Sequence, residues 1–219
     1  MLEGTTMSDS LISTEVILRW LEICAKTFRE HKDDLTALDA AIGDADHGAN
    51  MARGFEAVQG KLASMQGQDI GAIFKTTAIT LISTVGGASG PLYGTFFLQA
   101  AATAAGKTSL TPAELHSVFH AGLQGLMSRG KAVVGEKTMV DAFLPAVDAL
   151  KPRGDDGAGK ALDRAVAAAK AGAESTVPLI AKKGRASYLG ERSVGHKDPG
   201  SVSTILLFEA LQQATRPPT

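Results

Sequence analysis

The sequence predicts an all-α protein, and three features of its pattern support this fold class. Apolar residues recur at spacings of three and four along most of the chain, which is the period of one helix face. N-cap residues and glycine breaks separate these segments, as they do at helix ends. No segment shows the sustained alternation of apolar and polar residues that a half-buried strand requires.

Helical segments follow one another along the chain with mostly short links. The first, at about 14–30, carries an apolar stripe that includes Trp20, Cys24 and Phe28. The others are expected at about 35–42, 48–63, 70–82, 91–104, 111–128, 138–150, 161–182 and 201–214. Short links make neighbouring helices antiparallel, so we expect a bundle of about eight up-and-down helices.

Local signals support several of these boundaries. Asp69 can cap the fourth segment, whose inward stripe is expected to include Ile79 and Ile82. Residues 111–114 form a capping box with proline in the first helical position. Residues 198–199, an aspartate and a proline, give the last segment a similar start.

Length and composition narrow the class of protein. With 219 residues and no evident boundary or repeat, we expect a single domain over residues 13–219 and a disordered or tag-like extension over residues 1–12. A net charge of −1 gives no overall attraction to nucleic acid or to anionic membranes. The lone cysteine, Cys24, excludes an intramolecular disulfide and is expected to be a buried, inert thiol. With no apolar run long enough to span a membrane, we expect a cytoplasmic protein.

The most informative stretch is 38–50, which places Asp39, Asp44 and Asp46 within eight residues. Carboxylates this close repel one another unless a cation lies between them, and Mg2+ and Ca2+ prefer oxygen ligands. Taken singly, each aspartate is more often a helix cap or a surface residue. A loop needs only one cap, however, so the group of three predicts a divalent-metal site that also holds phosphate.

A calcium-binding EF-hand is the first alternative to this interpretation. A loop that begins at Asp44 requires Asp or Asn at its fifth position, glycine at its sixth and glutamate at its twelfth. The sequence has Gly48, Ala49 and Phe55 at these positions, which excludes the EF-hand.

Three further connections have the composition of anion-binding loops. The glycine-rich segment 83–91 precedes a helix start, where free N–H groups suit an anion, although a tight helix corner would also use these residues. It lacks the lysine of a Walker loop, and the chain has no Rossmann glycine fingerprint. The segment 182–200 is long and basic, and 128–139 carries Met139, which suits either an adenine face or plain core.

These connections are expected to meet at one end of the bundle. In an up-and-down bundle, alternate connections lie at the same end, so the acidic stretch and the three loops can share one rim. Three carboxylates facing a polyphosphate would repel it, so cations must lie between them. We therefore expect a nucleotide held through two Mg2+ ions.

Four sequence blocks resemble the nucleotide-binding L subunit of dihydroxyacetone kinase, of the type that depends on the phosphoenolpyruvate phosphotransferase system. The first block is 43–48, which Asp39 precedes. The other three blocks are 86–95, 128–139 and 183–193. They occur in the expected order and spacing, and the resemblance extends over nearly the whole chain from about residue 14.

The resemblance implies a barrel-like bundle with Mg-ADP or Mg-ATP at one end. Asp39, Asp44 and Asp46 would ligate two Mg2+ ions and, with Arg185, would form the catalytic group. Ala88 and Ser89 would offer backbone and hydroxyl donors to phosphate. The full set implied to bind the nucleotide is His47, Gly48, Ala49, Asn50, Ala88, Ser89, Gly130, Met139, Arg185, Asp198, Pro199 and Gly200.

The same resemblance implies how such a subunit acts. The nucleotide would pass its terminal phosphoryl group to dihydroxyacetone bound on a separate K subunit, and a phosphohistidine carrier fed by phosphoenolpyruvate would recharge it. Three alternatives remain at this point. They are a nucleotide-binding regulator without transfer activity, the nucleotide domain of another kinase such as a fatty acid kinase, and a Mg-dependent nucleotide hydrolase.

Overall fold

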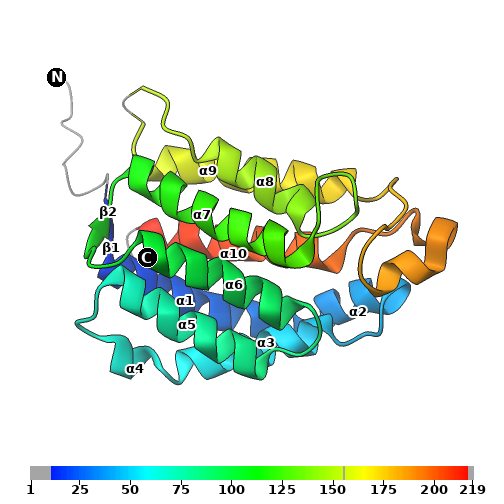
Figure 1. The fold of residues 1–219 in the computed structure, drawn as a ribbon, viewed down its shortest axis with the longest axis horizontal. Helices are drawn as coiled ribbons and strands as arrows, with labels where there is room; N and C mark the ends of the chain where they lie inside the picture. Colours follow the sequence, from blue (N-terminus) through cyan, green and yellow to red (C-terminus); the bar gives the residue numbers. More distant parts are fainter. Residues whose placement is uncertain (1–10, 155, 217–219) are drawn as a thin grey trace.

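Figure 1 shows the fold of the protein as a computed structural model, which describes residues 11–154 and 156–216. These residues form ten α-helices, one 3-10 helix and two very short strands, which confirms the predicted all-α class. In chain order the elements are β1 (Ile12–Ser13), α1 (Thr14–Glu30), α2 (Lys32–Ile42), α3 (His47–Gln59), α4 (Leu62–Met65), α5 (Ile70–Thr84), α6 (Ser89–Thr103), β2 (Ser109–Leu110), α7 (Pro112–Gly130), α8 (Val140–Ala149), α9 (Ala158–Ser175), the 3-10 helix η2 (Arg185–Ser193) and α10 (Pro199–Thr215).

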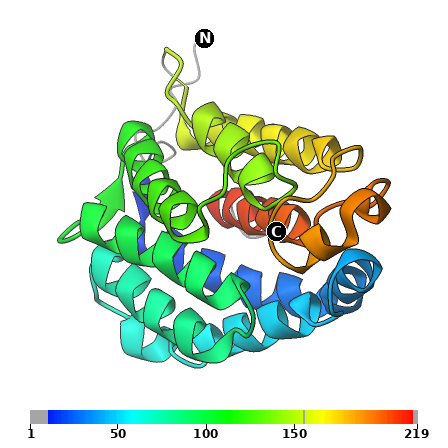
Figure 2. The same cartoon turned by 45° about the vertical axis from the view of Figure 1, so that its right-hand side comes forward.

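The long helices form an antiparallel bundle with α10 in its middle. The turned view in Figure 2 shows α10, in red, surrounded by the other helices. Eleven of the 17 residues of α10 are buried, and it packs against α1, α8 and α9. A helix that is apolar or small on every side is stable only when it is enclosed, so the composition of α10 explains its central position.

An aromatic cluster around Trp20 holds the bundle together. The Trp20 ring stacks on Phe119 with ring centroids 5.7 Å apart and also contacts Phe74 and Phe97. Its indole N–H donates a hydrogen bond of 2.9 Å to the carbonyl of Leu207 on α10. Trp20 therefore joins α1 to α5, α6, α7 and α10 at one point.

The structure corrects several predicted boundaries. The helix expected over 161–182 begins at Ala158 and ends at Ser175, because Pro178 follows closely and the residue before a proline disfavours helical backbone. The segment expected over 48–63 breaks at Gly60 into α3 and α4. The 182–200 connection, expected to be a loop, contains the 3-10 helix η2.

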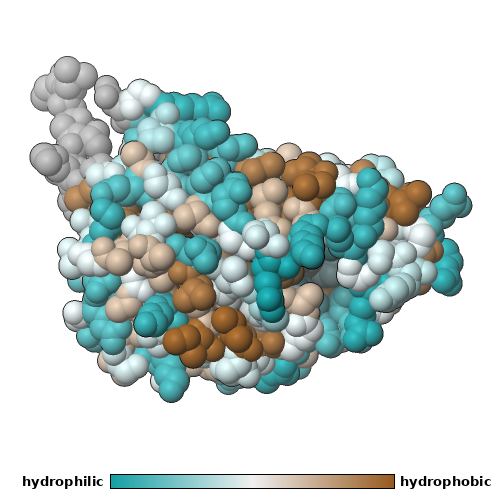
Figure 3. Space-filling model, viewed as in Figure 1, coloured by the Kyte–Doolittle hydropathy of each residue, from teal (hydrophilic) through white to brown (hydrophobic). Residues whose placement is uncertain are grey.

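The predicted inward stripe of α5 is also wrong in part. Ile79 and Ile82 are 57% and 48% exposed, whereas Ile73 and Phe74 are buried. Because α5 is apolar around most of its circumference, helical periodicity alone does not determine which side faces the core. Figure 3 shows the resulting brown apolar area over α5 and α6, to which Ile79, Ile82 and Leu98 contribute.

The described part of the chain begins with a short strand rather than with the first helix. Ile12 pairs with Leu110 in the two-stranded β1–β2 ladder and is buried, so the folded region includes Ile12. Residues 1–10, expected to be a tag-like extension, lie outside the described residues. Cys24 is buried, as predicted. Within the described ranges, no helix combines the length and hydropathy needed to cross a bilayer.

Replacing Trp20 by alanine tests the role of the aromatic cluster. Trp20→Ala removes the stacked ring and its hydrogen bond to the Leu207 carbonyl, so it should lower the free energy of unfolding by about 3–5 kcal/mol. Ile79→Ala, on the exposed side of α5, should lower it by well under about 1 kcal/mol. Urea unfolding followed by circular dichroism measures both. Equal effects of the two substitutions would show that Trp20 does not organise the core.

Candidate functional site

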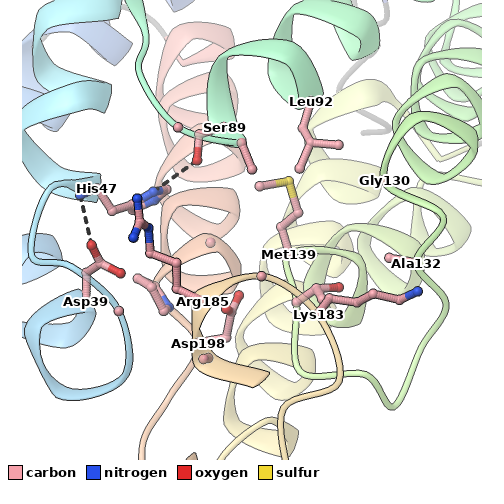
Figure 4. A pocket seen from close by; sticks show the side chains of 18 of the residues that line it. Asp39, His47, Ser89, Leu92, Gly130, Ala132, Met139, Lys183, Arg185 and Asp198 are labelled. Atoms are coloured by element: carbon pink, nitrogen blue, oxygen red, sulfur yellow. Dashed lines mark hydrogen bonds between the residues drawn. The ribbon is translucent and has the colours of Figure 1, made fainter. Parts of the chain in front are cut away.

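A pocket of about 400 Å³ lies at one end of the bundle. Its wall comes from the four connections that were expected to share a rim: the α2–α3 loop, the loop before α6, the α7–α8 loop and the η2 segment before α10. Figure 4 shows the side chains of these segments turned toward one another. The predicted convergence of the four connections is therefore confirmed, and the volume suits a small-molecule ligand.

Four helices begin at this pocket. Their N-terminal residues His47, Ser89, Val140 and Pro199, which start α3, α6, α8 and α10, all line it. The first turn of a helix has N–H groups without partners inside the helix and carries the positive end of the helix dipole. Four such ends around one cavity favour an anionic ligand such as phosphate.

The three aspartates predicted to hold metal lie together on one side of the pocket. Asp39, Asp44 and Asp46 each offer a carboxylate oxygen, and these atoms lie within 4.8 Å of one another. Asp39 is buried, Asp46 is half-buried and Asp44 is exposed. Oxygen donors at this spacing suit a hard divalent cation.

Asp39 orders the loop between α2 and α3. Its Oδ2 accepts hydrogen bonds from the backbone N–H groups of Asp46, at 2.9 Å, and His47, at 3.1 Å. Asp39 thus caps α3 from the preceding helix, and the Asp46 side chain makes no capping bond. An ordinary N-cap aspartate would use its carboxylate to accept a hydrogen bond from the first turn of the helix. The carboxylate of Asp46 makes no such bond and therefore remains free for a ligand.

The tight loop depends on residues with unusual backbone or no side chain. Ala45 has a left-handed backbone with φ of 60°, which reverses the chain between Asp44 and Asp46. A Cβ atom on Gly43 would overlap Oδ1 of Asp39, so only glycine allows Asp39 its position.

Basic side chains also line the pocket. Nε of Arg185, on η2, lies 2.8 Å from Oδ2 of Asp44, and the Arg185 side chain is 69% exposed at the pocket mouth. Arg129, Lys137 and Lys183 also line the pocket. The site therefore holds both signs of charge, which is the arrangement that a metal-bound anion requires.

Lys137 is a buried lysine that sequence reasoning did not single out. Its ammonium group donates to the carbonyls of Thr176, at 2.6 Å, Val177, at 3.4 Å, and His196. Burial lowers the pKa of Lys137, and the Asp198 and Asp141 carboxylates oppose that effect. Lys137 joins the α7–α8 loop to the chain on both sides of η2, and no local pattern in the sequence signals these long-range bonds.

Asp198 caps α10 at the back of the pocket. Its Oδ2 accepts a 2.6 Å hydrogen bond from the N–H of Ser201, and its own N–H donates to Oγ1 of Thr176 at 3.0 Å. Desolvation raises the pKa of Asp198 to about 7, and the nearby Asp141 carboxylate contributes in the same direction. Burial lowers the pKa of His47, opposed by Asp39 and Asp46.

Most of the residues expected to bind a ligand do line the pocket. The lining set includes Asp39, Asp44, Asp46, His47, Ala88, Ser89, Gly130, Met139, Arg185, Asp198, Pro199 and Gly200. Gly48, Ala49 and Asn50 belong to the first turn of α3 and are not among the lining residues. Gly48 instead packs against α2, where a Cβ would overlap the carbonyl of Lys32.

Asn50 lies behind the pocket wall rather than in it. A Cβ on Gly86 would lie 2.9 Å from Oδ1 of Asn50, so the amide packs directly on the glycine-rich loop. Nη2 of Arg53 donates to Asn50 Oδ1 at 2.5 Å, and Nε of Arg53 donates to the carbonyl of Thr84 at 2.9 Å. Asn50 therefore supports the loop that carries Ala88 and Ser89.

The fold and the pocket define a class of protein, a helical bundle whose end pocket combines an acidic cluster with several helix N-termini. A family model described as the DAK2 domain matches residues 41–213. The chain therefore belongs to the DAK2 domain family. The resemblance to the L subunits of dihydroxyacetone kinase, found in the sequence motifs, is also confirmed by the relatives described next.

Full-length relatives and solved structures agree with this assignment. The chain is 46% identical over 207 residues to the PEP-dependent dihydroxyacetone kinase, ADP-binding subunit DhaL, of Escherichia coli strain K12, covering 94% of this chain and 99% of the relative. The native dihydroxyacetone kinase of C. freundii matches with a TM-score of 0.72 and 26% identity. That match covers 97% of this chain and 37% of the solved chain. The structure of the same kinase in complex with AMP-PNP and Mg2+ matches in fold with a TM-score of 0.71 and 24% identity.

Adding a methyl group at Gly43 tests the geometry of the acidic cluster. Gly43→Ala forces Asp39 away from its position, so it should weaken Mg2+ binding by about tenfold, as substitutions beside metal ligands do. Gly60→Ala is the matched control, because a Cβ there makes only an ordinary 3.5 Å contact with the carbonyl of Ala57. Calorimetric titration with Mg2+ measures both. Unchanged binding in Gly43→Ala would show that Asp39 is not part of a metal site.

The raised pKa of Asp198 predicts a dependence of stability on pH. Between about pH 4 and 7 the folded protein keeps a proton on Asp198 that the unfolded chain has released, so the free energy of unfolding should fall as pH rises. The slope for one proton is up to about 1.4 kcal/mol per pH unit. Asp198→Asn keeps the cap and should flatten this slope, whereas the exposed Asp33→Asn should not. Urea unfolding of the nucleotide-free protein at several pH values measures the difference.

Proposed function

We propose that the chain is the nucleotide-binding subunit of a dihydroxyacetone kinase and that its end pocket holds an adenine nucleotide with Mg2+. The observation that carries this proposal is the meeting of three carboxylates, four helix N-termini and four basic side chains at one pocket. Neither sign of charge alone would suit both a polyphosphate and a cation. The names of the full-length relatives support the same function.

In this proposal, Asp39, Asp44 and Asp46 ligate two Mg2+ ions. The residues fit that role, because each aspartate offers an oxygen within 4.8 Å of the others and Asp46 is not consumed as a cap. When bound, the ions offset the negative charge of both the aspartates and the phosphates. The fold shared with a kinase solved with AMP-PNP and Mg2+ supports this cofactor.

The nucleotide contacts divide between the two sides of the pocket. We assign the phosphates to the side where α3 and α6 begin, with His47 and the Ala88–Ser89 backbone as their neighbours. We assign the base and ribose to Gly130 and Met139, because Met139 is a polarisable apolar side chain at the α8 start and lies beside Gly200, where an added Cβ would come within 3.3 Å of it. Asp198, Pro199 and Gly200 would close the remaining wall.

The chain would act on a phosphoryl acceptor that a separate K subunit supplies. Arg185 lies at the pocket mouth, where it is paired with Asp44 and its side chain is largely exposed. Its charge would stabilise the phosphoryl group during transfer to dihydroxyacetone. A phosphohistidine carrier fed by phosphoenolpyruvate would then recharge the bound ADP, as the name of the relative in Escherichia coli, a PEP-dependent kinase subunit, supports.

Removal of one carboxylate tests this function. Asp44→Ala should lose bound nucleotide and phosphoryl transfer, by about a hundredfold or more in transfer rate, because it removes a metal ligand. Asp33→Ala, at an exposed position on the preceding helix α2, is the matched control and should retain both. The nucleotide released on denaturing each purified protein is identified by chromatography, and transfer is measured with K subunit and dihydroxyacetone. Circular dichroism checks that helical content is unchanged.

The outcomes separate the remaining alternatives. Ordinary phosphoryl transfer by Asp44→Ala would refute the assigned metal role. Wild-type protein that binds ADP but transfers nothing with a K subunit present would indicate a nucleotide-binding regulator. Sustained phosphate release without any partner would indicate a hydrolase. Transfer only with a fatty-acid-binding partner would indicate the nucleotide domain of a fatty acid kinase.

A further inference from the structure

A chain of buried hydrogen bonds runs from the pocket wall into the core. Oγ of Ser89 lies 3.1 Å from Nδ1 of His47, and Nε2 of His47 lies 3.0 Å from Oγ of Ser203. Oγ of Ser203 lies in turn 2.8 Å from the hydroxyl of Tyr93. Ser203 and Tyr93 are fully buried, and Ser89 and His47 are at most 9% exposed. These hydrogen bonds link α3, α6 and α10 near the start of each helix.

The direction of these hydrogen bonds follows from counting hydrogens. A serine or threonine hydroxyl has one hydrogen to donate and two lone pairs that accept. Oγ of Ser203 donates to the carbonyl of Gly200 at 2.9 Å, and Oγ1 of Thr204 donates to the same carbonyl at 2.9 Å. In this arrangement both hydrogens are used within α10. With its hydrogen on the Gly200 carbonyl, Ser203 meets Tyr93 and His47 as an acceptor.

Tyr93 and His47 are the two neighbours that must then donate to Ser203. The hydroxyl of Tyr93 lies closer to Ser203, at 2.8 Å, than to Thr204, at 3.4 Å, so its hydrogen points to Ser203. The remaining lone pair of Ser203 faces Nε2 of His47. A neutral imidazole carries its hydrogen on one nitrogen only, so a hydrogen on Nε2 leaves Nδ1 as an acceptor.

We propose that Ser203 is a positioning residue that holds His47 in the Nε2–H tautomer, and that Ser89 consequently donates its hydroxyl hydrogen to His47 Nδ1. Figure 4 shows the Ser89 hydroxyl directed at the His47 ring. With its hydrogen committed in this way, Ser89 presents oxygen lone pairs to the pocket. Ser203 reaches the pocket only through His47 and Ser89.

The consequence of this tautomer for ligand binding rests on the proposed function. If the pocket holds a nucleotide, the phosphates near α6 are bound by backbone N–H groups of its first turn and not by the Ser89 hydroxyl. The Ser89 oxygen is then available to a cation or to a water molecule bound by the cation. This revises the expectation that Ser89 donates its hydroxyl to phosphate. The opposite tautomer would reverse the polarity of Ser89, so Ser203 determines which kind of ligand atom that site accepts.

Magnetic resonance of isotope-labelled histidine reads the tautomer directly in the nucleotide-free protein. A long-range nitrogen–hydrogen correlation spectrum assigns the ring hydrogen, and His47→Gln identifies which signals belong to His47. The wild type should show hydrogen on Nε2 and a bare Nδ1. Ser203→Ala should lose the slowly exchanging Nε2 hydrogen signal. Thr204→Val should keep this signal. The substitution also removes a hydroxyl hydrogen bond to the Gly200 carbonyl, but Thr204 makes no hydrogen bond to His47.

Titration with ADP and Mg2+ tests whether Ser203 acts through Ser89. Ser203→Ala and Ser89→Ala should each weaken binding about tenfold, and the double variant should weaken it no more than the weaker-binding single variant. A merely structural role for Ser203 predicts independent effects, which would multiply to about a hundredfold. Thr204→Val should bind within about twofold of the wild type.

Each outcome decides one part of the inference. Hydrogen on Nδ1 in the wild type, or multiplied losses in the double variant, would overturn it. If Ser203→Ala fails to fold, the wild-type spectrum still decides the tautomer, and Tyr93→Phe, which leaves the Ser203–Gly200 bond intact, should retain the Nε2 hydrogen. If the wild-type tautomer is as expected but ADP does not bind, the proposed function fails and the tautomer assignment stands.

Discussion

The hydrogen bonds from the backbone of Asp46 and His47 to the Asp39 carboxylate connect the fold to its chemistry. Asp39 belongs to α2, and by capping α3 it sets the position of the loop that carries Asp44 and Asp46. The three nearby carboxylates repel one another, and these two hydrogen bonds offset part of that repulsion. The absence of a side chain at Gly43 is part of the same constraint, since a methyl group there would occupy the place of Asp39 Oδ1.

The remaining elements of the site surround this loop from other helices. The starts of α6, α8 and α10 bring backbone N–H groups to the rest of the pocket wall, and η2 brings Arg185 to the mouth. Lys137 holds the α7–α8 loop to the chain on both sides of η2 through bonds to Thr176 and His196. The pocket is thus built almost entirely from helix ends, and the bundle interior supplies rigidity through the Trp20 cluster rather than ligands.

Polar groups buried behind the pocket extend its organisation into the core. His47, Ser203 and Tyr93 lie on three different helices, and their hydrogen bonds leave no side chain of the three without a partner. Such a fully paired network is rigid, because breaking any member leaves a buried polar group unpaired. It gives the helix starts a fixed relation to one another, which a site made of loops alone would lack.

The sequence by itself determined the helical class, the position of most helices and the composition of the acidic and glycine-rich connections. These properties are local: periodicity, caps and glycine breaks act over a few residues, and the order of blocks identified the family. Only the tertiary structure decided which side of α5 faces the core and where α9 ends. It also showed that Asn50 lies behind the pocket wall, and that Lys137 and Ser203 support that wall. These features depend on contacts between residues far apart in the chain, such as His47 with Ser203, and no local pattern encodes which distant hydroxyl an imidazole will meet.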